Sequence, residues 1–290
     1  MTKPYKQNEM VWLSVLQGFA MLLVVIGHVI HGGEGNFAWQ SIVNKIIYSF
    51  HMPLFMCISG YLFHKTQVSK NKPFDLMLKN KAIRLLVPYF SLTLFCLVLK
   101  IAFSEYMRRK SEFSINQLLD AFVWMTNNPL GEMWFINALF GLMLLYPVYL
   151  FANKNNGFAF LLFVCFFVLH FIETSIPSFV LNFGKIISYA VFFYGGILLS
   201  QFGFGKNFKY GTALFSSFRN YTYQVFLLGI FPQVAVRIAF QKMFTKELGV
   251  GEIVLLYVSS IGLGLYIPVL ISKIAQKLDL KVFKLCIGLR

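Results

Sequence analysis

The sequence predicts an all-α protein, a polytopic bundle of about eight transmembrane helices with both termini in the cytoplasm. The composition is the first observation behind this prediction. Of the 290 residues, 58% are hydrophobic and 13% are charged, and the mean hydropathy is +0.67. A soluble domain is roughly half apolar and about a quarter charged, so a soluble core of this size cannot bury so much apolar surface.

Long windows without Asp, Glu, Lys or Arg are the second observation. A spanning helix needs roughly 20 mainly apolar residues, because the hydrocarbon core is about 30 Å thick and a helix rises about 1.5 Å per residue. Two of the windows are short, and each can borrow flanking residues. The windows are 11–30, 46–63, 85–99 (extending to 103), 133–151, 157–172, 186–204, 220–236 and 253–272.

The distribution of charge is the third observation, and it orients the bundle. Cytoplasmic loops of membrane proteins collect Lys and Arg. With eight spans and both termini inside, the inner segments hold about two thirds of the 26 basic residues but only three acids, Glu9, Asp75 and Asp279. The asymmetry favours an even number of spans. It also explains the high pI through orientation and anionic lipid headgroups rather than through nucleic acid.

No soluble domain or low-complexity linker interrupts the apolar windows, which predicts one membrane-embedded domain over 1–290. The four cysteines lie in or beside apolar segments without CxxC spacing, so we expect no metal site. The segment 115–125 is amphipathic, and we expect it to lie on the outer surface or to dip into the membrane.

Polar residues inside a span are costly and often functional, which draws attention to the first window. Gln17 and His28 are eleven residues apart, so at about 100° per residue they share one face of a helix, separated by about 16 Å. In this orientation Gln17 lies toward the cytoplasm and His28 toward the outer leaflet. His31 follows near the same stripe, where we expect it to contact substrate.

His51 enters the second span at a depth comparable with that of His28. Two imidazoles can then face one another in the outer half of the bundle, and an imidazole suits proton abstraction from a hydroxyl. The alternative is that each histidine only donates a hydrogen bond to a neighbouring helix. Gly60, in the same span, favours close helix packing.

Basic residues at the inner edge of the third span can bind an anionic donor. Arg84 suits bidentate phosphate binding, with Lys81 beside it, although physical chemistry alone favours the alternative that Arg84 is a positive-inside anchor. At the outer start of the fourth window, Glu132 and Trp134 are candidates for substrate binding; the alternative is a solvated acid and an interfacial tryptophan. In the seventh window, Gln233 is expected to form an interhelical hydrogen bond.

These segments resemble acyltransferase family three, integral membrane enzymes that acylate sugars or other cell-surface hydroxyls. LQGFAMLLVVIGH resembles the first helix of the family and SFHMPLFMCISGYLF its second. RLLVPYF is similar to the start of its third helix, and MWFINALF and NYTYQVFLLG are similar to later segments in the right order. The first two motifs together are the specific ones.

The resemblance implies an enzyme that transfers an acyl group, most simply acetyl, from acyl-CoA to a hydroxyl of a cell-surface glycan or glycolipid. His28 matches the essential histidine of the family and is implied to act as the base, with His51 as its partner. Arg84 matches an arginine that handles the acyl-CoA donor. The partners implied are this donor, the glycan acceptor and a bilayer, in a bacterial plasma membrane.

Two positions depart from the family pattern. Gln17 stands where the family has an arginine, which retains hydrogen bonding near the expected cofactor but loses the charge. Gly229 stands where many members have a histidine. The family is also usually assigned ten spans, against eight here. These departures leave a second hypothesis open, a non-catalytic relative that aids polysaccharide export or assembly.

Overall fold

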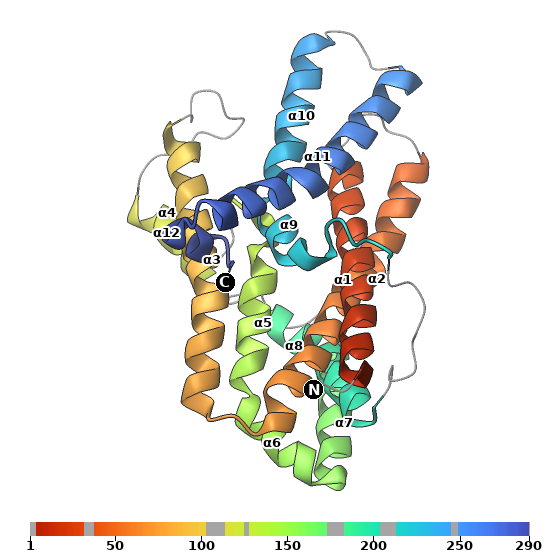
Figure 1. Cartoon of the computed structure of the whole chain (residues 1–290), viewed down its shortest axis with the longest axis vertical. Coiled ribbons are helices and arrows are strands. Elements are labelled where there is room, and N and C mark those ends of the chain that lie inside the picture. The colour runs from red at the N-terminus through yellow and green to blue at the C-terminus, as the bar shows by residue number, and fades with distance from the viewer. Residues whose placement is uncertain are drawn as a thin grey trace. The chain divides into compact units, whose positions relative to one another are not determined.

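The computed structural model describes residues 4–31, 38–102, 114–124, 128–172, 183–203, 213–244 and 249–289. In these ranges every regular element is a helix, which confirms the predicted all-α class (Figure 1). The chain divides into two compact units. Unit 1 comprises 1–58, 203–284 and 289, and unit 2 comprises 59–202, 285–288 and 290. The expectation of a single domain over 1–290 stays a prediction.

Five of the described helical segments are long and apolar enough to cross a membrane, and up to seven spans result if each of two bent pairs counts as one. The chain is therefore a multi-pass membrane protein, while the number eight and the orientation of the termini stay predictions. The predicted window 157–172 is a helix of 17 residues, Asn156–Ile172, which is too short to count. The five segments are Val11–His31, Trp39–Lys70, Phe74–Ala102, Phe183–Gln201 and Val250–Lys277.

Unit 1 is built around α11 (Val250–Lys277), a helix near the C-terminus. This helix packs against α1 (Pro4–His31), α9 (Thr222–Leu228) and α10 (Ile230–Met243). It also holds the first part of α2 (Ala38–Thr66), η7 (Arg219–Tyr221) and most of α12 (Lys281–Cys286). Its core consists of Met21, Val24, Val25, Phe218, Val225, Leu265 and Val269.

The core determines which way α1 faces. Met21, Val24 and Val25 recur at helical spacing and bury one stripe of α1. His28 lies seven residues after Met21, so it continues this stripe one turn beyond the core. The sequence pattern of the first helix therefore directs His28 toward the helices that cover the core.

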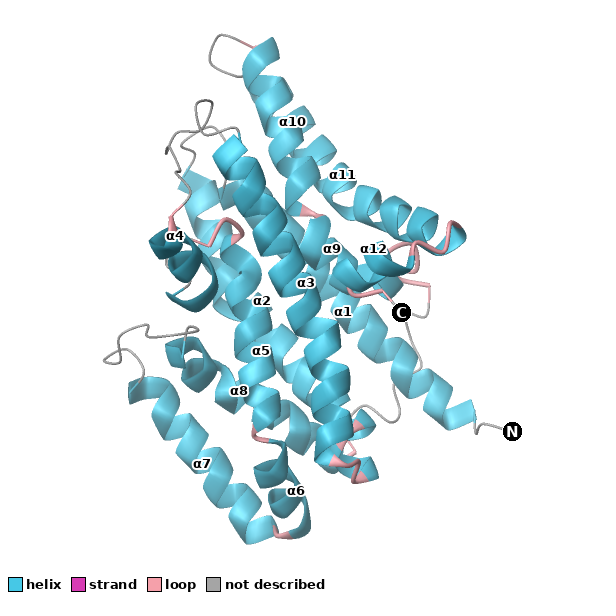
Figure 2. Ribbon diagram, turned by 90° about the vertical axis from the view of Figure 1, so that its left-hand side faces the viewer, coloured by secondary structure: helices cyan, strands magenta, loops and turns pink. Residues whose placement is uncertain are grey.

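Unit 2 contains the rest of α2 and a series of helices in which α8 packs against α5 and α7, and α3 packs against α5 (Figure 2). The other elements cover the ends of these helices. The elements are η1 (Val68–Lys70), α3 (Phe74–Ala102), α4 (Ile115–Leu119), η3 (Asp120–Trp124), η4 (Gly131–Met133), α5 (Trp134–Leu144), α6 (Tyr146–Lys154), α7 (Asn156–Ile172) and α8 (Phe183–Gln201).

Gly60 brings α2 and α8 into close contact, because a Cβ atom at this position would collide with the backbone carbonyl of Phe193. This confirms the expected packing role of Gly60. One turn further along α2, the buried His64 joins three helices. Its Nδ1 lies 2.7 Å from the Ser200 hydroxyl of α8, and its Nε2 lies 2.9 Å from the Asn153 amide oxygen of α6.

The predicted amphipathic segment 115–125 forms α4 and η3, and residue 125 lies outside the described residues. Ser114 caps α4, since its hydroxyl accepts a hydrogen bond from the backbone N–H of Gln117 over 3.1 Å. The backbone carbonyl of Phe122 accepts a hydrogen bond from the Tyr89 hydroxyl of α3 over 3.0 Å. The segment thus packs against α3.

Two predicted windows, 133–151 and 220–236, are broken rather than straight. The first bends by 51° between α5 and α6, and the second bends by 57° between α9 and α10. Proline lies in the first turn of the second helix in both pairs, Pro147 in α6 and Pro232 in α10. A proline lacks the N–H donor and clashes with the carbonyl four residues earlier, which ends the preceding helix.

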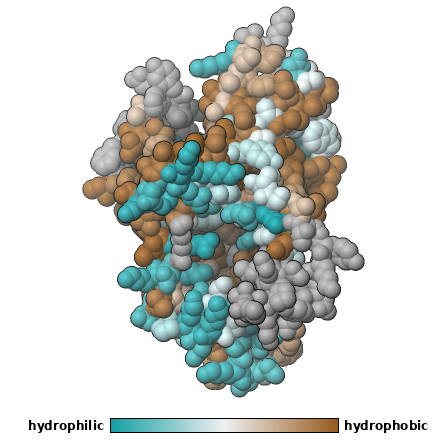
Figure 3. Space-filling model, viewed as in Figure 1, coloured by the Kyte–Doolittle hydropathy of each residue, from teal (hydrophilic) through white to brown (hydrophobic). Residues whose placement is uncertain are grey.

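On the face shown in Figure 3, apolar residues gather in the upper part of the view, while many polar residues lie in the lower part. On α11 the side chains of Val254, Leu255 and Val258 are exposed. Contiguous apolar surface of this kind is typical of helices that face lipid.

Candidate functional site

Three histidines predicted from the sequence meet around one tyrosine of unit 1. The ring of Tyr48, on α2, lies 4.9 Å from the ring of His51, 5.9 Å from that of His31 and 6.4 Å from that of His28, measured between centroids. The contacts with His51 and His28 are edge-to-face. The expectation that His28 and His51 lie at matched depth is consistent with this cluster, in which Tyr48 contacts both.

His51 is buried, and its Nδ1 lies 2.6 Å from the backbone carbonyl of Ile47. A carbonyl can only accept, so Nδ1 carries the proton and donates, which leaves the lone pair on Nε2. His31 is exposed, and the Asn44 amide nitrogen lies 3.3 Å from its Nδ1. The hydroxyl of Tyr48 lies 3.5 Å from Nδ1 of His28, at the outer limit of a hydrogen bond.

A glycine beside His28 allows α1 and α2 to approach each other at this cluster. A Cβ atom at Gly27 would lie 3.2 Å from both the Ile47 side chain and the Tyr48 ring. That distance is tighter than ordinary van der Waals contact, so a side chain at this position would push Tyr48 away. The small residue next to His28 therefore helps to place the tyrosine against the histidines.

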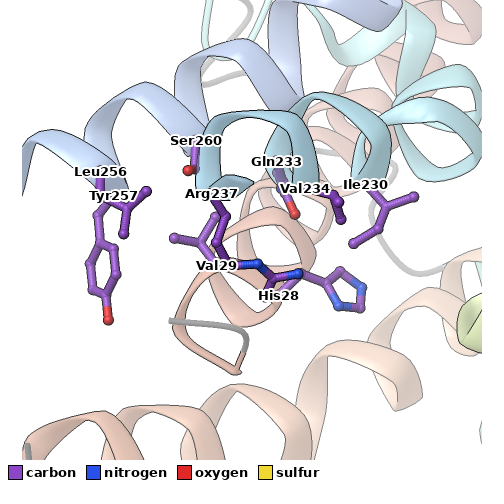
Figure 4. Close-up of a pocket in the computed structure, with 9 residues that line it drawn as sticks. All are labelled: His28, Val29, Ile230, Gln233, Val234, Arg237, Leu256, Tyr257 and Ser260. Atoms are coloured by element: carbon purple, nitrogen blue, oxygen red, sulfur yellow. The ribbon is translucent and has the colours of Figure 1, made fainter. Parts of the chain in front are cut away.

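On its other side, His28 lines a cleft between α1, α10 and α11 (Figure 4). The cleft contains about 30 Å³ of free space. A water molecule needs about 10–15 Å³ by this measure, so two or three water-sized groups fit. Five of the lining residues are polar. The cleft is lined by His28, Val29, Ile230, Gln233, Val234, Arg237, Leu256, Tyr257 and Ser260.

Gln233 and Arg237 lie one turn apart on α10, so both side chains leave the same face of the helix. Gln233 is 6% exposed, and its amide nitrogen donates to the backbone carbonyl of Val25 on α1 over 3.4 Å. This confirms the expected interhelical hydrogen bond. In Figure 4 the Arg237 side chain extends from α10 toward the part of the cleft lined by His28.

Gln17 is half-buried on α1, about 16 Å along the axis from His28. The next residue, Gly18, packs against the segment before α9, since a Cβ atom there would lie 2.7 Å from Cβ of Phe215 and 3.1 Å from Cβ of Arg219. An arginine from another element thus approaches α1 beside the position where the family pattern has its own arginine.

The predicted donor-binding residues lie in unit 2, on the first turns of α3. Arg84 is exposed, whereas Lys81 is half-buried with its Nζ 5.6 Å from the ring centroid of the buried Phe63. The two residues are three apart, so their side chains emerge on neighbouring parts of one helix face. This arrangement presents one accessible guanidinium and one ammonium anchored over an aromatic ring.

Glu132 and Trp134 lie at the start of α5 in the same unit. Trp134 packs against Tyr189 of α8 at 5.2 Å between ring centroids, and Nζ of Lys185 lies 5.8 Å from the Trp134 ring. Glu132, in η4, is close enough to Cys96 to interact with it electrostatically. Cys96 is twelve residues beyond Arg84 on α3, or about 18 Å along the helix, so Glu132 and Arg84 are not brought together.

Gly229, where many family members have a histidine, lies between α9 and α10. A Cβ atom here would lie 2.5 Å from the carbonyl of Val225 and 3.0 Å from that of Gly264, so no side chain fits without a shift of the backbone. Within the described parts of the chain, no group of three or more His, Cys, Asp or Glu residues could hold a metal ion.

Sequence reasoning missed Tyr48 and the participation of α10 and α11. Tyr48 lies three residues before His51, a helical spacing that signals contact once His51 is singled out. Gln233 and Arg237 share the same kind of signal, because two polar residues at i and i+4 in an apolar helix mark one polar face. Nothing local in the sequence indicates that this face meets His28.

Comparison with known proteins identifies the family of the chain. A family model described as an acyltransferase domain matches residues 10–219. The nodulation protein NolL of Sinorhizobium fredii is 31% identical over 142 residues, which cover 48% of this chain and 36% of that protein. NolL of Mesorhizobium japonicum is 34% identical over 128 residues, 43% of this chain and 31% of that protein.

Each of these two matches thus spans about a third of the relative's own length. No solved structure matches the chain. The family match includes α1, α2 and α3, which carry His28, His51 and Arg84, and it ends before α10. Since the match extends over well more than half of the chain, the protein belongs to acyltransferase family three of integral membrane proteins.

Proposed function

We propose that the chain is a membrane O-acyltransferase that moves an acyl group, most simply acetyl, from acyl-CoA to a hydroxyl of a cell-surface glycan or glycolipid. The observation that carries the proposal is the position of His28, which lies between the histidine–tyrosine cluster and a cleft lined by the cation Arg237. A base beside a positive charge is the arrangement that acyl transfer to a hydroxyl requires.

In this proposal His28 is the general base. In this step Nδ1 donates to the oxygen of Tyr48, and Nε2 takes the proton of the acceptor hydroxyl. The hydroxyl oxygen then attacks the thioester carbonyl, and the negative charge of the tetrahedral intermediate is stabilised by Arg237. The C–S bond breaks, the CoA thiolate takes the proton from His28, and the products are an O-acyl ester and CoA.

The donor is proposed to reach the chain at its basic side. Arg84 and Lys81 would bind the phosphates of CoA, and Gln17 would contact the donor by hydrogen bonding. About 16 Å separates Gln17 from His28 along α1. The extended pantetheine arm of CoA is comparable with this length, so it can carry the thioester from the depth of Gln17 to that of His28.

The acceptor side is proposed to include His31, at the exposed end of α1, and Glu132 with Trp134. With the basic side in the cytoplasm, as the charge distribution predicts, the histidine cluster lies toward the outer leaflet of a bacterial plasma membrane. What supports a transferase is the match of residues 10–219 to an acyltransferase domain.

The test is acyl transfer in membranes from labelled acetyl-CoA, scored as membrane-bound label that is released by mild alkali. The variant His28→Asn is expected to lose the incorporation at unchanged protein level. His170→Ala is the matched control, because His170 of unit 2 bonds the Ser188 carbonyl at 2.7 Å and has no part in the proposed reaction. Equal incorporation by the wild type and by His28→Asn would remove His28 from the mechanism.

A non-catalytic role in glycan export or assembly is the second candidate, and the observation in its favour is Gln17, which lacks the charge of the family's arginine. The two candidates differ in what deletion of the protein does to the surface glycan. A loss of acyl groups per sugar supports the transferase, whereas a change in the amount of glycan at constant acyl content supports the export role.

A further inference from the structure

We infer that the acceptor is a vicinal diol, and that Gln233 accepts a hydrogen bond from the hydroxyl adjacent to the one that His28 deprotonates. The inference rests on the proposed function and specifies the substrate class of the same cleft. It places Gln233 as the residue that determines specificity for the acceptor.

The side-chain oxygen of Gln233 is the starting observation. The residue is 6% exposed and lines the cleft, and its Oε1 is a buried atom that has no hydrogen-bond partner among the described residues. A buried acceptor without a partner costs about 1–3 kcal/mol, so such atoms are rare unless a ligand or water satisfies them. Figure 4 shows this oxygen directed from α10 toward the cleft.

The side-chain amide of Gln233 cannot satisfy its oxygen by rotating through about 180°, which would exchange the oxygen and the nitrogen. Its nitrogen faces the carbonyl of Val25, which accepts hydrogen bonds only, so exchange of the nitrogen and oxygen would place two acceptors together. Gly264 of α11 also lies close to the amide nitrogen, since a Cβ atom there would lie 2.8 Å from it. The hydrogen bond to Val25 therefore fixes which end of the amide is the oxygen.

The chemistry that satisfies this oxygen is a hydroxyl or N–H donor that enters with the substrate. His28 lines the same cleft and, as the proposed base, takes one hydroxyl of the acceptor. The free space of about 30 Å³ holds two or three water-sized groups, which is enough for two neighbouring hydroxyls. Two hydroxyls on adjacent carbons fit this pair of contacts, while the rest of the acceptor stays outside.

The experiment compares two matched probes as inhibitors of label transfer from acetyl-CoA to the endogenous membrane acceptor. trans-1,2-Cyclohexanediol and trans-1,3-cyclohexanediol have the same atoms and differ only in whether the hydroxyls are adjacent. The 1,2-isomer is expected to inhibit the wild type with an inhibition constant about tenfold lower, because a site built to accept a hydroxyl discriminates against a ligand that cannot provide it.

Two variants connect this preference to Gln233. Gln233→Met removes the amide at similar size and is expected to abolish the preference, whereas Val234→Ala, which changes an apolar residue of the same cleft wall, is expected to retain it. Equal inhibition by both diols in the wild type, or an unchanged preference in Gln233→Met, overturns the inference. The proposed function fails by a different result, namely no His28-dependent transfer of label in the absence of any diol.

Discussion

Replacement of Tyr48 tests whether its ring, rather than its hydroxyl, organises the histidines. Tyr48→Ala removes edge-to-face contacts with His51 at 4.9 Å and His28 at 6.4 Å. Aromatic pairs contribute about 0.5–1.5 kcal/mol each, so the two together restrain the imidazoles by about 1–3 kcal/mol. If this restraint is used to place the base, kcat falls by about fivefold to 150-fold, at 1.36 kcal/mol per factor of ten.

Tyr48→Phe keeps the ring and removes only the hydroxyl. The distance of 3.5 Å to Nδ1 of His28 is at the limit of a hydrogen bond, so its loss is expected to reduce kcat by only about twofold. The assay is initial-rate transfer from labelled acetyl-CoA in membranes with equal amounts of each variant. A loss in Tyr48→Phe as large as in Tyr48→Ala, or full activity in Tyr48→Ala, would refute this role of the ring.

The remaining predictions concern unit 2. His64→Ala breaks two buried hydrogen bonds and should destabilise the detergent-solubilised protein by about 2–4 kcal/mol in thermal unfolding. Ser200→Ala breaks only one of them and should cost about 1 kcal/mol. Equal effects of the two variants would contradict the bridging role of His64. Gly60→Ala should lower the Tm because α2 and α8 must separate, while Gly195→Ala, with nothing within 4 Å of the added Cβ, should leave it unchanged or higher. Arg84→Gln should raise the KM for acetyl-CoA about threefold to tenfold at constant kcat, and an unchanged KM would dissociate Arg84 from donor binding.

Helix type and location follow from the sequence because hydropathy acts locally. An uncharged window such as 11–30 can only satisfy its backbone as a helix in lipid, and the structure has α1 there. The breaks were harder to predict. Pro53, Pro88 and Pro268 lie inside continuous helices, whereas Pro147 and Pro232 begin new ones, so proline alone does not locate a bend.

The candidate site could be predicted on α1 and α2 but not on α10. His28 and His51 are conspicuous because each is a titratable group in an apolar window. Gln233 and Arg237 are just as unusual in their window, yet only the packing of α10 against α1 gives them a role. Tertiary contacts between segments 200 residues apart leave no local pattern in the chain, which is why this half of the cleft needed a structure.

The bend between α9 and α10 sets the position of the cleft's polar wall. Arg237 lies eight residues beyond Gly229, or about 12 Å along α10, so a 57° change of direction displaces it by about 11 Å from where a straight helix would put it. The bend at Gly229 therefore determines where the side chains of Gln233 and Arg237 lie. Relatives with a similar hydropathy profile but a different angle at this joint would present a different set of side chains to the same histidine.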